Sequence, residues 1–116
     1  VQEEYSWLVY EDEGEVLGFI YADRWKGRSA YRYTAETTIY LKKTAARRGI
    51  GRSLYGEMLP FLKRQGVRRV LVCIALPNQA SIGLHESLGF KKVGIFHEVG
   101  YKFNSWIDIG YWELPL

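Results

Sequence analysis

The stretch from residue 39 to residue 65, IYLKKTAARRGIGRSLYGEMLPFLKRQ, decides how the whole chain is interpreted. Its pattern predicts a strand, a tight basic turn and then an amphipathic helix. The turn RRGIGR, residues 47–52, places two glycines at the helix start, and glycine allows close approach of a ligand. Free N–H groups at a helix start attract anions. We therefore predict a diphosphate site made by Arg47, Arg48, Gly49, Ile50, Gly51 and Arg52.

The composition of the chain limits the classes of protein to which it can belong. With 116 residues, 47% of them hydrophobic and 25% charged, we expect one soluble domain over residues 1–116. The net charge of +3 suits a polyanionic small ligand and gives little support for nucleic acid. The single cysteine, Cys73, excludes an internal disulfide and a cysteine metal cluster, so we expect a cytoplasmic location and no metal. No apolar run approaches the length of a membrane span, and the first residue, Val1, predicts a processed, trimmed or partial start.

Hydrophobic periodicity predicts the element order β-β-β-α-β-α-β-β. The predicted strands cover residues 7–10, 16–22, 30–41, 70–76, 92–102 and 107–114. We expect the helix after the glycine turn to kink or loosen at Pro60 and to stop at Gly66. A second helix should be capped by Asn78 or Ser81 and end at Gly89.

The strand, helix and strand in the middle of this order predict a parallel pair joined by a right-handed crossover. The apolar run VLVCIAL, residues 70–76, predicts a strand that is buried on both faces of the sheet. A ligand should then bind beyond the carboxyl ends of the parallel strands. The predicted fold class is α/β, or α+β, with a central mixed sheet.

Two motifs resemble those of a known family. RRGIGRSLY, residues 47–55, resembles the acyl-CoA pyrophosphate loop of the GNAT superfamily of N-acetyltransferases, and PNQASIGLHESLGFKKVG, residues 77–94, resembles a later motif of that superfamily. GFIYADRWKGRSAYRYTAETTIYL and VGYKFNSWIDIGYWELPL, residues 18–41 and 99–116, extend the resemblance to the phosphinothricin and methionine sulfoximine N-acetyltransferases. The resemblance implies the GNAT fold, a twisted mixed sheet with flanking helices. We expect the first strand and first two helices of that fold to be missing here.

Three positions depart from the pattern of the family. Ala46 stands where the loop usually opens with Gln or Arg, which leaves Arg47 or Arg48 to compensate. His85 stands where many members of the superfamily have Tyr. Phe103 stands where some phosphinothricin-resistance members have His, which favours the methionine sulfoximine or sulfone branch.

The resemblance also implies how acetyl-CoA is held. The turn at residues 47–52 would bind its pyrophosphate; the alternative is a solvated basic loop. The backbone of Ile39, Tyr40 and Leu41 would pair with the pantetheine arm and polarise the thioester carbonyl; the alternative is an ordinary strand end. Asn78 and Ser81 would contact the same arm. The alternative for each is a helix cap, which we favour for Ser81.

Candidate catalytic residues follow from the chemistry of acetyl transfer to an amine. A base must take a proton from the incoming ammonium, and Glu36, about 16 Å before the strand end, suits this role. Its alternative is a salt bridge to Arg32. His85 would donate a proton to the departing thiolate, or it is a half-buried helix histidine. Arg28, Tyr31, Arg32 and Tyr33 would recognise the acceptor, or form a cationic aromatic edge or dimer surface.

These residues together predict an enzyme that moves acetyl from acetyl-CoA to the α-amine of a small amino acid. The predicted acceptors are L-methionine sulfoximine, methionine sulfone or phosphinothricin, and the chain would work as a possible homodimer. A second hypothesis is an acyl-CoA-binding module without catalysis. A third is a nucleic-acid or phosphopeptide module that uses the same basic turn, which the modest net charge disfavours.

Overall fold

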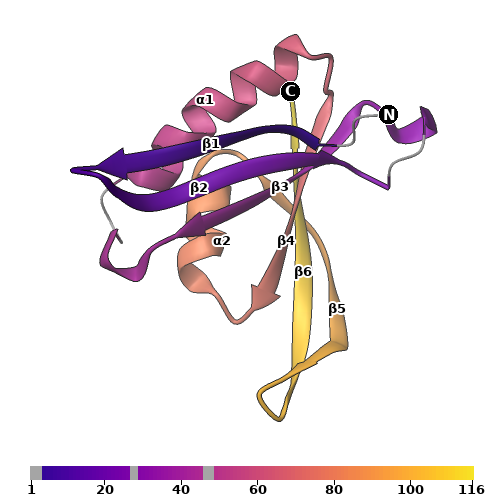
Figure 1. Ribbon diagram of the computed structural model, residues 1–116. Helices are drawn as coiled ribbons and strands as arrows, with labels where there is room; N and C mark the ends of the chain where they lie inside the picture. The colour runs from indigo at the N-terminus through magenta and orange to yellow at the C-terminus, as the bar shows by residue number, and fades with distance from the viewer. Residues whose placement is uncertain (1–3, 27–28, 46–48) are drawn as a thin grey trace.

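The computed structural model describes residues 4–26, 29–45 and 49–116, and these form a mixed sheet with helices on one side (Figure 1). The strands are β1 (Glu4–Asp12), β2 (Glu15–Arg24), β3 (Thr34–Leu41), β4 (Arg69–Leu76), β5 (Lys91–Lys102) and β6 (Ser105–Pro115). The helices are α1 (Ile50–Arg64) and α2 (Gln79–Ser87), with short 3-10 turns at Ser29–Tyr31 and Lys43–Ala45. The sheet has the order β1-β2-β3-β4-β6-β5, with β3 and β4 parallel and every other pair antiparallel. The predicted order of strands and helices is confirmed.

The third strand begins later than its sequence suggested. We expected an extended segment over residues 30–41, but residues 29–31 form a 3-10 turn and β3 starts at Thr34. The partner strand β2 ends at Arg24, opposite Ala35, so earlier residues have no strand of β2 beside them. Arg32 therefore lies outside β3 and does not share a strand face with Glu36.

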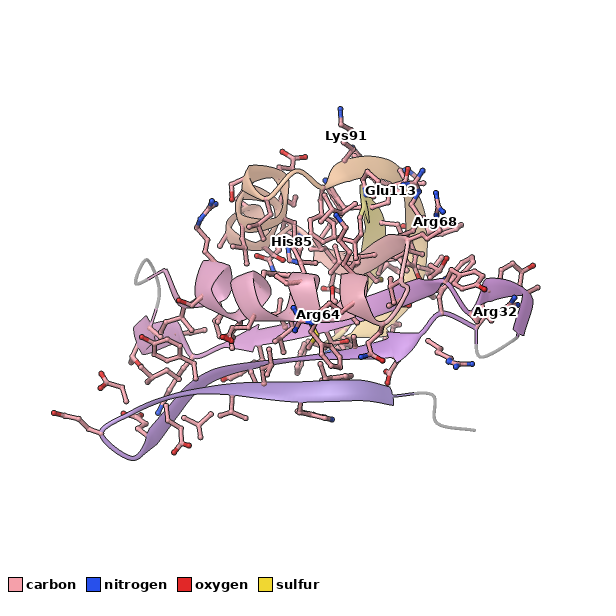
Figure 2. The ribbon with its side chains drawn as sticks, turned by 90° about the horizontal axis from the view of Figure 1, so that it is seen from above. Arg32, Arg64, Arg68, His85, Lys91 and Glu113 are labelled. Carbon is pink, nitrogen blue, oxygen red and sulfur yellow. The ribbon has the colours of Figure 1, made fainter. Side chains whose placement is uncertain are left out.

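Strand β4 lies between β3 and β6, but it is not buried on both faces. Val70, Val72 and Ile74 are buried, whereas Leu71 and Cys73 are only partly buried. Both helices of the described chain cover the same face. Thr37, Val72 and Trp112 pair across three strands on that face, where Thr37 meets α1 and Trp112 meets α2. Figure 2 shows α1 lying along this face of the sheet.

Local backbone chemistry explains where the helices begin and end. Helix α1 starts after Gly49 and continues through Pro60 to Arg64, so the expected loosening at Pro60 does not occur. Gly66 and Gly89 follow the two helices with φ of 90° and 101°, as predicted for helix stops. Asn78 caps α2, because its side chain accepts a hydrogen bond from the Ser81 N–H at 3.1 Å. The preference for Ser81 as the cap was wrong.

Candidate functional site

The parallel strands β3 and β4 separate halfway along their length. They pair from Thr34 with Arg69 to Thr37 with Val72. Beyond this point β3 continues to Leu41 and β4 to Leu76 without pairing with each other, and Figure 1 shows the two strands diverging. A cleft of about 290 Å³ opens between them at their carboxyl ends. Its lining includes the predicted site residues Glu36, Ile39, Asn78, Ser81 and His85.

The start of α1 presents backbone N–H groups that have no partner inside the helix. Gly49 is the N-cap, in the left-handed conformation with φ of 74°, and no side chain caps the helix. The first intrahelical bond runs from the Ser53 N–H to the Gly49 carbonyl at 3.0 Å, which leaves the N–H groups of Ile50, Gly51 and Arg52 without a partner inside the helix. This geometry suits an anion.

The other residues of the turn have different surroundings. Arg47 and Arg48 lie outside the described residues. The Arg52 guanidinium donates to the Ser87 hydroxyl at 2.8 Å, so it links α1 to α2 at the surface. A Cβ on Gly51 would lie 2.8 Å from a methyl carbon of Leu84, so this glycine also allows the two helices to approach closely.

Glu36 is the carboxylate of the cleft. Its side chain is half-buried, and Asp23 lies directly opposite it across the β2–β3 pair. Burial, and secondly the charge of Asp23, raise the pKa of Glu36 above its ordinary value. Cys73, also at the cleft, has its thiol pKa raised by burial and by the charge of Glu36, whereas the Tyr111 hydroxyl opposes this rise.

His85 is completely buried and belongs to a chain of hydrogen bonds. Its Nδ1 lies 2.7 Å from the Ser81 carbonyl oxygen, and its Nε2 lies 2.7 Å from the Tyr55 hydroxyl. The Tyr55 hydroxyl in turn lies 2.8 Å from the Thr37 hydroxyl. Burial lowers the pKa of His85, although the Ser81 carbonyl opposes this effect. The half-buried histidine predicted from the sequence is thus more deeply placed than expected.

The strand end has two different faces. Ile39 lines the cleft, and Leu41 packs against the core. The Tyr40 ring is exposed and stacks on Phe19 at 5.4 Å between ring centroids, on the face that the helices leave open. A pantetheine contact from Tyr40 would therefore have to use its backbone.

The predicted acceptor residues lie at the other end of β3. Arg28 is outside the described residues. Tyr31 packs edge-on against Trp25 at 5.4 Å, and the Arg32 guanidinium lies 4.5 Å from the centre of the Tyr33 ring. None of these three described residues lines the cleft, and Figure 2 shows Arg32 well away from His85.

Sequence reasoning missed the polar groups behind and beside the cleft. Tyr55 falls within the apolar stripe of α1 and was not singled out, and Thr37 was given no role. A hydroxyl within that stripe, opposite a threonine on the inner face of a strand, was the available signal. Tyr111 was also missed, since its meeting with Cys73 depends on the β4–β6 register.

The described ranges, residues 4–26, 29–45 and 49–116, contain neither a candidate metal site nor a candidate membrane-spanning helix. No three His, Cys, Asp or Glu side chains there are grouped so as to hold a metal ion. None of their helices combines the length and apolar character needed to cross a bilayer.

The fold is that of the GNAT acetyltransferases. The crystal structure of an N-acetyltransferase from Staphylococcus aureus Mu50 superposes with a TM-score of 0.90 at 37% identity, covering 94% of this chain and 66% of that one. A GNAT superfamily phosphinothricin acetyltransferase from Sinorhizobium meliloti, solved with AcCoA, gives a TM-score of 0.89 at 35% identity and covers 95% and 60%. The expected fold class is confirmed.

Sequence comparison narrows this result. The family model for the acetyltransferase (GNAT) domain matches residues 1–110, and the chain belongs to that family. It is 42% identical to the phosphinothricin N-acetyltransferase of Streptomyces viridochromogenes over 97% of this chain and 62% of the relative. It is 34% identical to the L-methionine sulfoximine/L-methionine sulfone acetyltransferase of Salmonella typhimurium over 97% and 66%. These relatives confirm the predicted subfamily resemblance, and the chain spans less than two thirds of their length.

Proposed function

We propose that the chain carries the acetyl-transfer site of an N-acetyltransferase that uses acetyl-CoA and a small amino acid. The observation that carries this proposal is the cleft between β3 and β4. The half-buried carboxylate of Glu36 lines this cleft, beside the ends of two strands that no longer pair with each other. The named relatives are N-acetyltransferases of this kind, which supports the same chemistry here.

The residues around the cleft fit acetyl-CoA, which would supply the acetyl group as a thioester. The N–H groups at residues 50–52 would bind the pyrophosphate, with Arg52 beside them and Arg47 and Arg48 as predicted further contacts. Backbone groups of Ile39, Tyr40 and Leu41 would pair with the pantetheine amides. Asn78 and Ser81 lie on the opposite wall, where Asn78 serves as the helix cap and keeps amide donors available.

Glu36 would take the proton from the acceptor ammonium, directly or through water. A carboxylate with a raised pKa holds a proton more readily at neutral pH, which makes Glu36 a better base than an exposed glutamate. Backbone N–H groups at the strand end would stabilise the charge that develops on the carbonyl oxygen. Loss of one such donor typically costs about 3 kcal/mol of transition-state stabilisation.

The predicted proton donation by His85 faces a geometric constraint. Both of its ring nitrogens are engaged inside the protein, so a donor role would require one of these bonds to break. Coenzyme A thiol is acidic enough to leave without help at modest cost. We therefore propose that Glu36 takes the proton from the acceptor ammonium and that the coenzyme A thiolate leaves without a proton donor. His85 would then keep its buried hydrogen bonds.

The proposed acceptors are L-methionine sulfoximine, methionine sulfone and phosphinothricin. The predicted acceptor contacts, Arg28, Tyr31, Arg32 and Tyr33, precede Glu36 along the chain. Because the amine and the carboxylate of an α-amino acid share one carbon, an acceptor with its amine at Glu36 would extend its sulfur- or phosphorus-bearing end, not its carboxylate, toward Arg32. We further propose a cytoplasmic location and a homodimer, in which the exposed Phe103 and Trp106 of the β5–β6 hairpin are available for contact.

The test measures thiol release from acetyl-CoA with a panel of amino-acid acceptors. The wild-type chain should turn over at least one of the three proposed acceptors. Glu36→Gln should lose most turnover at neutral pH and keep its affinity for coenzyme A, since the amide cannot accept the proton. Wild-type protein that binds coenzyme A but acetylates no amine would instead support the acyl-CoA-binding module. No binding of coenzyme A would refute both functions.

A further inference from the structure

We propose that Tyr55 is a positioning residue for acetyl transfer: its hydroxyl joins β3 to α2 and fixes the width of the cleft. This inference rests on the proposed function of the cleft. It assigns a role to a fully buried residue of α1 that lies behind the cleft and not in its lining.

The hydrogen-bond chain through Tyr55 begins where β3 and β4 separate. Thr37 is the last residue of β3 that pairs with β4, so it marks the point where the two strands separate. The Thr37 hydroxyl lies 2.8 Å from the Tyr55 hydroxyl, which lies 2.7 Å from His85 Nε2. The His85 ring continues the chain to the backbone of α2. A single series of contacts thus connects the point of strand separation to the opposite wall.

The direction of each hydrogen bond can be worked out. The Ser81 carbonyl oxygen can only accept, so His85 Nδ1 must carry a hydrogen and donate it. Burial keeps the imidazole neutral, so Nε2 carries none and accepts from the Tyr55 hydroxyl. The oxygen of Tyr55 then accepts from the Thr37 hydroxyl. Each of the three hydrogen bonds in the series thus has one direction.

Three of the four residues in the hydrogen-bond chain also line the cleft. Thr37, Ser81 and His85 line it, whereas Tyr55 stands behind them and is fully buried. The rings of Tyr55, His85 and Phe90 pack edge to face, with centroids 5.1–5.7 Å apart. Removal of one hydroxyl therefore breaks two links and leaves the rings in place. A displacement of about 1 Å at a reacting centre can cost about a hundredfold in rate.

The simpler explanation is that Tyr55 only satisfies buried polar groups, as most buried polar side chains do. The two explanations differ in what the folded protein does. A purely structural hydroxyl changes the fraction of folded protein, whereas a positioning hydroxyl changes turnover and cofactor affinity in molecules that remain folded. The control variant must therefore lose stability without changing any residue of the hydrogen-bond chain.

The experiment compares Tyr55→Phe with Leu62→Val in the full chain, well below both unfolding midpoints. Leu62 is buried two turns further along α1 and lies outside the cleft. We expect Tyr55→Phe to lower kcat by about tenfold to a hundredfold, with a smaller rise in KM for acetyl-CoA. Leu62→Val should stay within about twofold of wild type in both constants. Equal constants in the two variants would overturn the proposal.

A second measurement separates this inference from the proposed function. The ¹⁵N resonances of His85 in the protein without cofactor should show the Nδ1–H tautomer, neutral at pH 7, and Tyr55→Phe should raise the pH at which the ring titrates. A charged His85 ring, or an Nε2–H tautomer, would rule out the proposed hydrogen-bond chain even if wild type acetylates amines. Wild type that shows the expected tautomer but binds no coenzyme A would refute the proposed function, and with it the positioning role.

Discussion

Two glycines with the same backbone geometry allow a matched test of the anion site. Gly49 begins α1 with φ of 74°, and Gly14 turns the β1–β2 hairpin with φ of 82°. A Cβ at either position would meet no atom of the described residues within 4 Å. The cost of Gly49→Ala or Gly14→Ala is therefore backbone strain alone, about 1–2 kcal/mol for the left-handed conformation. For a domain of this size we expect each unfolding midpoint to fall by about 4 °C or more.

The two variants should differ in binding. Gly49→Ala misdirects the N–H groups of the first helical turn, and loss of one hydrogen bond to a charged group costs about 1.5–3 kcal/mol. That corresponds to a rise of about tenfold or more in the Kd for coenzyme A, measured by titration calorimetry. Gly14→Ala should bind as wild type does. Gly49→Asn, which tolerates this backbone conformation, should recover most of the stability. Equal affinities of Gly49→Ala and Gly14→Ala would refute the placement of the pyrophosphate.

Three further predictions follow from individual side chains. Burial raises the pKa of Glu36 above 4.5 in the folded state, so the folded protein binds the Glu36 proton more tightly than the unfolded chain does. The stability that this protonated side chain contributes is fully present below pH 4.5 and is lost as pH rises through the raised pKa. Glu36→Gln, which cannot ionise, should therefore gain stability over wild type between about pH 4 and 8 in urea titrations. The partly buried thiol of Cys73, whose pKa burial raises, should react with iodoacetamide more slowly in the folded than in the urea-unfolded chain at pH 8. Trp112→Phe removes the 2.9 Å bond to Glu86 and should cost about 1.5 kcal/mol of unfolding free energy; no change would show that water replaces this bond.

The elements of this fold were predictable where local chemistry decides them. Gly49, Gly66 and Gly89 mark helix ends because a positive φ is easy only for glycine. The strands were found from their composition. The start of β3 was not, because residues 30–33 have strand-forming side chains but no partner strand of β2 beside them. The one-sided burial of β4 was also missed, since an apolar run does not show which of its faces the helices cover.

The site was partly predictable for similar reasons. Glu36, Asn78, Ser81 and His85 were singled out by the resemblance, and the structure brings them to one cleft. The bonds of Tyr55 to two other segments depend on how α1 lies across the sheet, and no spacing in the sequence encodes that. The predicted roles of these residues stay predictions until the variants above are measured.

The sheet consists of two antiparallel halves, β1-β2-β3 and β4-β6-β5, joined by the short parallel pairing of β3 with β4. The β1–β2 and β5–β6 turns close within a few residues, whereas β4 meets β3 only after the whole of α1 and meets β6 only after α2 and β5. Hairpins form in about 1–10 μs, but contacts between distant segments must first overcome the entropy of closing the intervening loop. We therefore expect the pairings of β4 with β3 and β6 to form last and to limit the folding rate. The cleft between β3 and β4, proposed above as the acetyl-transfer site, would then lie beside the strand that is the last to join the sheet.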